Sequence, residues 1–174
     1  MRSYLSGLTF ATVLFAAPVY AQQQAAPAAP PAPPPGYGAP ISLDDAPISL
    51  DDAKKAAAGA EAEMKKNNWN LVIAVVGPSG DLVYLQKADL AAVASVTVAH
   101  EKAKTSATFR APSKVFMDRL ANGETYLLRL PGATPVAGGL PIIMGGKVVG
   151  AIGVSGASSL QDHQAAQAGI DALK

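Results

Sequence analysis

Hydrophobic and polar residues recur along this chain with two different periods. From Leu50 to about Asn67 small apolar residues return every three to four positions while lysine and glutamate fill the rest, which predicts an amphipathic helix. Ser49, with Asp52 three residues later, provides a capping-box-like start. The continuously apolar run Leu71 to Val76, the turn GPSG and the β-rich run Asp81 to Lys87 then predict a hairpin whose first strand is central.

The middle of the chain is mostly helical in character. A long Ala-rich stretch from about Leu90 to Phe109 predicts a second helix. Pro112-Ser113 starts a shorter helix that ends near Asn122-Gly123. The segment from Glu124 to Leu130 is compatible with either a strand or a loop.

The last third of the chain returns to a β pattern before a final helix. Gly139 to Met144 and Lys147 to Val154 are predicted strands, joined by the turn Gly145-Gly146. Ser158 or Ser159 then caps a helix, with Gln161 and Asp162 as the candidate capping-box partners.

This order of elements defines the expected fold class. Helix, hairpin, helices, hairpin and helix are typical of an antiparallel sheet with helices packed on it, so the class is α+β. Pro141 lacks a backbone N–H and places its strand at an edge of the sheet or at the strand's own beginning. Gly150 and Gly153 indicate that a ligand or another backbone comes close to the last strand; helix–sheet packing is the simpler explanation.

The N-terminal quarter lies outside this domain. Residues 1–21 resemble a signal peptide, with Arg2 as the n-region, an apolar core and Val19-Tyr20-Ala21 before a cleavage point after Ala21, so a periplasmic or secreted product is expected, without stable membrane insertion. Residues 22–47 form a linker rich in Ala, Pro and Gln, with too little apolar surface to fold. The heptapeptide APISLDD occurs twice in tandem, at 39–45 and 46–52, and the second copy leads into the domain at 48–174.

Composition limits the classes of partner and of stabilisation. The 174 residues suffice for one modest domain. Removal of Arg2 with the signal peptide leaves thirteen basic and thirteen acidic residues, a balance that does not favour nucleic acid as a partner. There is no cysteine, so in an oxidising compartment the fold depends on packing alone.

Several glycine-rich segments resemble known functional motifs but differ from them in residue type or spacing. Gly145-Gly146-Lys147 resembles the end of a phosphate loop, but Val148 stands where Ser or Thr would bind magnesium. The glycines at 150, 153 and 156 are spaced GxxGxxG rather than GxGxxG, which argues against a dinucleotide site. The segment GVSGA at 153–157 misses the last glycine of a nucleophile elbow, so a serine hydrolase is not favoured.

Three segments carry a resemblance to a known family. AHEKAKTSATFRAPS (99–113), PGATPVAGGLPI (131–142) and KVVGAIGVSGASSLQDHQAAQAG (147–169) are similar, in this order, to the GlcG/HbpS family, and the match extends from about residue 48 to the end of the chain. The resemblance implies a profilin-like α-β-α arrangement, a homo-oligomer and, as in some members, haem as a bound cofactor.

Haem requires apolar walls, an axial ligand and partners for two propionates. His100, on a face of small apolar residues, and His163, near the start of the last helix where the dipole favours a neutral ring, are the candidate iron ligands. The alternatives are a core or interface histidine and a solvated one. By chemistry alone a small set of other side chains could also ligate iron, although core packing is favoured for each: Tyr84, Tyr126, Met117 and Met144.

Partners for the propionates are expected in the same segments. Lys102 and Arg110 supply positive charge around Phe109, and the amides after Gly156 open the last helix as an anion site. The same groups suit any small carboxylated ligand. The alternatives are a salt bridge for Lys102, a surface charge for Arg110 and ordinary core for Phe109.

Three functions from different classes follow. The chain is an exported haem-binding or haem-sequestering protein, an enzyme that degrades haem or acts on a small oxidised metabolite, or a non-catalytic oligomeric sensor or assembly module. No general acid, base or activated nucleophile is evident in the sequence, so whether the chain is an enzyme stays open and binding is favoured over catalysis.

Overall fold

The computed structural model describes residues 46–174. The predicted signal peptide at 1–21, the first copy of the repeat and nearly all of the predicted linker lie outside the described residues. The helices and strands are α1 (Leu50–Lys66), β1 (Val72–Val76), β2 (Leu82–Lys87), α2 (Ser95–Phe109), α3 (Ser113–Ala121), the short 3-10 helix η1 (Thr125–Arg129), β3 (Gly139–Met144), β4 (Lys147–Ser155) and α4 (Ser159–Asp171). None of the helices in this part of the chain is long and apolar enough to cross a membrane.

The four strands form one antiparallel sheet in the order β2-β1-β4-β3. The first strand of the first hairpin is central, as predicted, because β1 pairs with both β2 and β4. Pro141 lies in β3 at an edge of the sheet, which confirms the placement that its missing N–H requires.

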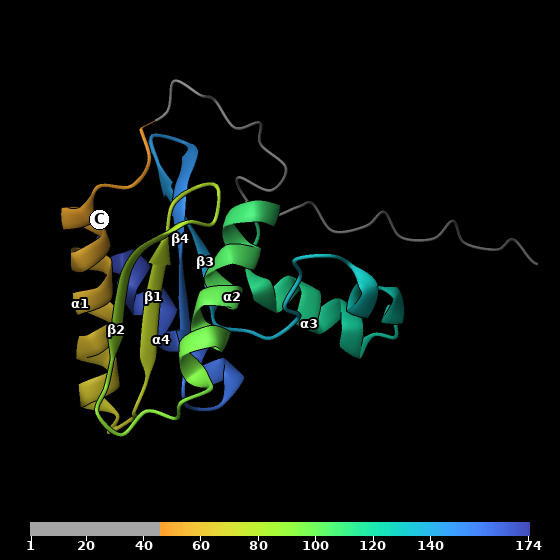
Figure 1. The fold of residues 1–174 in the computed structure, drawn as a ribbon, viewed down its shortest axis with the longest axis horizontal. Helices are drawn as coiled ribbons and strands as arrows, with labels where there is room; N and C mark the ends of the chain where they lie inside the picture. Colours follow the sequence, from red (N-terminus) through yellow and green to blue (C-terminus); the bar gives the residue numbers. More distant parts are fainter. Residues whose placement is uncertain (1–45) are drawn as a thin grey trace, which may run out of the picture. The chain divides into compact units, whose positions relative to one another are not determined.

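Helices cover both faces of the sheet (Figure 1). Ile73 and Val75 of β1 pack with the small residues of α1 and α4 on one face. Val72, Ala74 and Val76 point to the other face, where α2 covers them. Because side chains alternate between the two faces of a strand, β1 contributes apolar residues to the core on both sides of the sheet. The expected α+β class with an α-β-α arrangement is confirmed.

The second copy of the repeat fastens the start of the domain to the sheet. Ile48 is 5% exposed and its N–H donates to the Val149 carbonyl of β4 at 2.9 Å. Ser49 caps α1, since its Oγ accepts from the Asp52 N–H at 3.1 Å and donates to the Asp52 carboxylate at 2.7 Å. The predicted start of the first helix is confirmed.

Of the two central glycines of β4, Gly153 serves helix–sheet packing. A Cβ on Gly153 would lie 2.1 Å from the Ala99 carbonyl of α2, whereas one on Gly150 would lie 2.4 Å from the Val76 carbonyl of the neighbouring strand and 2.9 Å from the Ile48 side chain. Gly153 therefore lets the backbone of α2 approach the sheet more closely than any side chain would allow. Helix–sheet packing is confirmed for Gly153, while Gly150 makes room for β1 and for Ile48, and neither glycine lines the pocket between α1 and β1.

Two predicted elements are wrong in detail. The second helix begins at Ser95, because residues 88–94 form turns that carry the chain from the edge strand β2 to the opposite layer. The segment expected to be strand or loop is the 3-10 helix η1. Its Leu127 is buried against Ala111 and Phe116 while its neighbours are exposed, a spacing that a short helical turn satisfies.

Candidate functional site

The N-terminus of α4 is held by a complete capping box. Ser158 Oγ accepts from the Gln161 N–H at 3.4 Å, and Gln161 Oε1 accepts from the Ser158 N–H at 3.1 Å. Ser158 rather than Ser159 is thus the cap, with Gln161 as its partner. Asp162, the other candidate partner, is not part of the capping box and makes a different contact.

Asp162 is the centre of a buried charge network at the end of β4. Its Oδ2 accepts from Lys102 Nζ at 2.7 Å and its Oδ1 from the Ala157 N–H at 3.0 Å. Lys102 Nζ also donates to the Val154 carbonyl at 3.0 Å. Burial raises the pKa of Asp162, while Lys102 and the Ala157 amide act in the opposite direction by stabilising the carboxylate.

This network uses two of the groups predicted to meet haem propionates. The side chain of Lys102 is 1% exposed and forms an ion pair, which is the alternative expected for it. The amide that follows Gly156 donates to a carboxylate of the same chain, so the predicted anion site at this helix start is filled from within. The network fixes how α4 lies across the end of the sheet.

The next residue, His163, points away from that network towards α3. It is half-buried, and its Nδ1 is buried without a hydrogen-bond partner among the described residues. Burial lowers the pKa of His163, the Lys114 charge lowers it further, and Asp118 partly opposes them. His163 is the fifth residue of α4, so burial rather than the helix dipole is the main cause of the neutral ring. A neutral imidazole with an unused nitrogen is the form that binds metals.

The residues around His163 come from α3 and from one turn earlier in α4. Ser159, four positions before His163 and on the same helical face, places its Oγ 3.8 Å from Met117 Sδ. Lys114 pairs with Asp118 at 2.6 Å along α3. We call Lys114, Met117, Asp118, Ser159 and His163 the His163 face. It combines an imidazole, a thioether and a cation, and the adjacent Leu160 is 58% exposed.

The other predicted site residues lie elsewhere. His100 is half-buried on α2, with its Nε2 3.3 Å from the Gly80 carbonyl in the β1–β2 turn. The Phe109 ring centre lies 5.1 Å from that of Phe116, in the small core beneath α3 and η1. Arg110 is 5% exposed in a left-handed conformation, so the surface-charge alternative is wrong. None of the contacts described for His100 or Phe109 includes His163.

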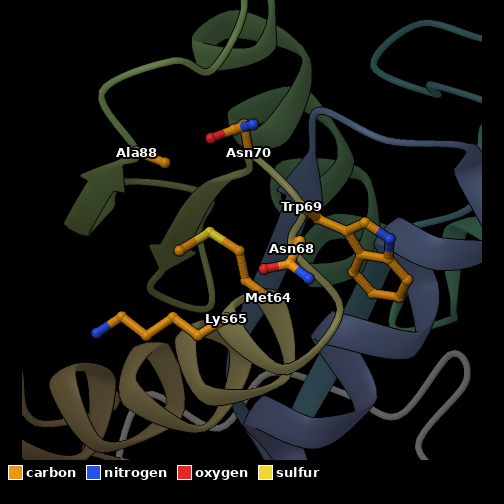
Figure 2. A pocket seen from close by; sticks show the side chains of 6 residues that line it. All are labelled: Met64, Lys65, Asn68, Trp69, Asn70 and Ala88. Atoms are coloured by element: carbon orange, nitrogen blue, oxygen red, sulfur yellow. The ribbon is translucent and has the colours of Figure 1, made fainter.

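A separate open pocket of about 420 Å³ lies at the junction of α1, β1 and the segment after β2. It is lined by Met64, Lys65, Asn68, Trp69, Asn70 and Ala88. Figure 2 shows Lys65 and Trp69 pointing in opposite directions, and Lys65 is paired with Glu61 at 2.7 Å. The pocket brings no imidazole and no convergent charges, and none of its residues was predicted as a site.

Sequence reasoning missed Lys114 and assigned Met117 to the core. The signal that could have found them is the spacing in SKVFMD, which puts Lys114, Met117 and Asp118 on one face of a short helix. The packing of this face of α3 next to His163 depends on the tertiary structure and could not be read from the sequence. Within residues 46–174 no group of three His, Asp or Glu side chains is placed to hold a metal ion.

Comparison with known proteins gives a consistent set of similarities. Residues 48–171 match the family described as haem degrading protein, HbpS-like. The chain is 38% identical over 99 residues to Protein GlcG of Escherichia coli K12, which covers 57% of this chain and 73% of GlcG.

Solved structures share the fold. A double mutant of Streptomyces reticuli HbpS superimposes with a TM-score of 0.70 at 32% identity, over 78% of this chain and 97% of that one. A PduOC–haem complex gives a TM-score of 0.66 at 22% identity, over 72% of this chain and 94% of that one, a likeness of fold alone.

Proposed function

The chain belongs to the HbpS-like family of haem-degrading proteins, and we propose that it is an exported protein that binds and sequesters haem through the His163 face. The family description makes its chemistry haem-related. The observation that carries the proposal is the buried, unpartnered Nδ1 of a neutral His163 beside the thioether and the cation of α3.

The donor set suits haem. His163 would supply the iron ligand because burial favours its neutral ring; Nε2, rather than the enclosed Nδ1, would be the nitrogen that reaches the iron. Lys114 would meet a propionate by exchanging its exposed pair with Asp118, at 2.6 Å, for the ligand; Lys102, first expected in this role, is buried against Asp162. Leu160 and Met117 would provide apolar contact for the macrocycle. Haem would supply the iron centre; these side chains would orient it and exclude water.

A haemin titration tests the proposal. The chain from residue 22 to 174 should give a saturable shift of the Soret band, which the His163→Ala variant should lose. The matched control is His100→Ala, which removes the other histidine and should retain the shift. Circular dichroism of each variant separates loss of a ligand from loss of the fold. A wild-type chain with no saturable shift, or a His163→Ala variant that binds as well as wild type, would contradict the proposal.

Export is tested separately. The segment Val19-Tyr20-Ala21 predicts that the mature protein begins at Gln22. N-terminal sequencing of the protein from the periplasmic fraction or the medium of the expressing cell should give that residue. Protein that stays in the cytoplasm with Arg2 intact would contradict export without affecting haem binding.

The family description favours a second function, degradation of haem. It needs a turnover signal that binding lacks. If haem bound to the protein keeps its Soret band under oxygen and a reductant, while free haemin in the same buffer is bleached, the chain protects haem rather than degrading it.

A further inference from the structure

Two polar side chains lie together on one face of α4 with unused hydrogen-bonding capacity. His163 Nδ1 is buried and has no hydrogen-bond partner among residues 46–174. Ser159 precedes His163 by four positions, so the two side chains are neighbours on the helix surface. Side chains in an α-helix lean towards its N-terminus, which directs the imidazole over the turn that holds Ser159.

The hydroxyl of Ser159 has one fixed role. Its Oγ lies 3.8 Å from Met117 Sδ of α3 and donates to it. A thioether has no proton to give, so the hydroxyl can only be the donor in this contact. A hydroxyl carries one proton and two lone pairs, and the lone pairs of Ser159 Oγ therefore remain available to a donor from another side.

The neutral ring of His163 can complete this arrangement in one tautomer only. With its proton on Nδ1, that nitrogen is a donor, and Ser159 Oγ is an acceptor one turn away. With the proton on Nε2, Nδ1 is an acceptor, but the proton of Ser159 already points to Met117. A buried polar atom without a partner is costly, so the tautomer with the proton on Nδ1 is favoured.

We propose that Ser159 is a positioning residue for His163: its Oγ accepts from the Nδ1–H and donates to Met117 Sδ, which leaves Nε2 unprotonated and available to iron. A small rotation of the ring closes the first of these two bonds. A metal-bound histidine commonly donates its other N–H to a fixed acceptor, which sets its tautomer and orientation. The inference rests on the proposed function, because iron is the ligand that needs the unprotonated Nε2.

This hydrogen bond acts on the tautomer more than on stability. Ser159 is half-buried, so water can take the place of its hydroxyl in a variant that lacks it. Water both donates and accepts, so it holds the ring in neither tautomer. Ser159→Ala should therefore keep the fold and change the state of the imidazole.

Nitrogen NMR of the free protein tests the tautomer without haem. In ¹⁵N-labelled chain 22–174 carrying His100→Ala, His163 supplies the remaining imidazole signals. Above pH 6.5, Nδ1 should have the chemical shift of a protonated ring nitrogen and Nε2 that of an unprotonated one. Ser159→Ala should move both shifts towards the averages of mixed tautomers, and Met117→Leu should do the same by removing the acceptor of the hydroxyl proton. Ser159→Thr keeps the hydroxyl and is the matched control.

Haemin affinity is the second measurement. Ser159→Ala should weaken haemin binding about tenfold or more, as expected when the partner of a metal-bound histidine is removed, and Ser159→Thr should not. A wild-type ring with its proton on Nε2, unchanged nitrogen shifts in Ser159→Ala, or unchanged haemin affinity in that variant would overturn the inference. An Nδ1–H tautomer that depends on Ser159, in a chain that binds no haemin, would support the hydrogen bond and contradict the proposed function alone.

Discussion

Lys102 of α2 and Asp162 of α4 form an ion pair of 2.7 Å across the end of β4, with side chains that are 1% and 2% exposed. The two helices lie on opposite faces of the sheet. The pair therefore ties the two helical layers together where the sheet between them ends, directly behind His163.

Breaking this pair should be costly. Lys102→Met leaves a buried carboxylate without its cation, and we expect the free energy of unfolding to fall by about 3–5 kcal/mol in urea denaturation. Lys104→Met, on the same helix in an exposed 3.8 Å pair with Glu101, is the control and should change it by less than about 0.5 kcal/mol.

The double variant Lys102→Met/Asp162→Leu should cost less than the sum of the two single changes, because no uncompensated charge then remains. Additive losses would show that the two side chains do not act as a pair.

Adding one methyl group at Gly153 should disturb the contact between α2 and the sheet. A Cβ there meets the Ala99 carbonyl and the Ala103 N–H, both backbone groups that cannot rotate away. We expect Gly153→Ala to lower stability by about 1–3 kcal/mol or more, seen as a lower Tm. Gly77→Ala is the control, since its nearest atoms lie 3.9 Å away or more; an equal loss in both variants would contradict this explanation.

Ser113 holds the start of β3 against α3. Its Oγ accepts from the Gly139 N–H at 2.8 Å and donates to the Val136 carbonyl at 2.7 Å. Ser113→Ala leaves a buried N–H unsatisfied, so a loss of about 1–3 kcal/mol is expected in chemical denaturation. Ser159→Ala removes a hydroxyl with only a weak sulfur contact and should cost much less.

Stability should depend on pH through His163. Burial and Lys114 hold the pKa of His163 below its ordinary value of 6.5 in the folded protein, so between those two pKa values the unfolded chain binds the proton and the folded chain does not. The free energy of unfolding therefore rises with pH in that interval, and stability present above pH 6.5 is lost as the pH falls through the folded-state pKa.

The matching measurement is denaturation across that pH range. His163→Gln should flatten the rise, whereas Gln167→Ala on the same helix should preserve it. A rise that persists unchanged in His163→Gln would show that another group produces it.

Local signals in the sequence were sufficient for most elements. The Ser49 cap, the Gly145-Gly146 turn and the cap of the last helix are set by groups within a few residues; the first two appear as predicted, and the structure selects Ser158 from the two predicted caps Ser158 and Ser159. The failures are instructive: Leu90 and Val93 match a helical pattern, yet they lie 81% and 87% exposed in a turn. The chain must cross there from an edge strand to another layer.

The candidate site could be predicted only in part. His163 was chosen by residue type as an iron ligand, and that role stays a prediction, whereas Lys102 and the amide after Gly156 were expected to meet propionates and instead meet Asp162. The partner of Lys102 and of the amide after Gly156 could not be predicted from local patterns. Both groups donate to the carboxylate of Asp162, which lies sixty residues from Lys102 along the chain. In the sequence Asp162 is simply one of two capping candidates.

By itself the sequence determined the α+β class, the order of the elements and the family. Hydrophobic periodicity, helix caps and turns depend on residues that are close together in the chain, so they can be recognised without knowing the fold. Only the tertiary structure decided which polar groups remain for a ligand. The crossing of α2 and α4 at the end of β4 buries Lys102 against Asp162, and the position of α3 leaves His163 Nδ1 without a partner. Whether a charge is satisfied depends on what folds against it, which no local pattern contains.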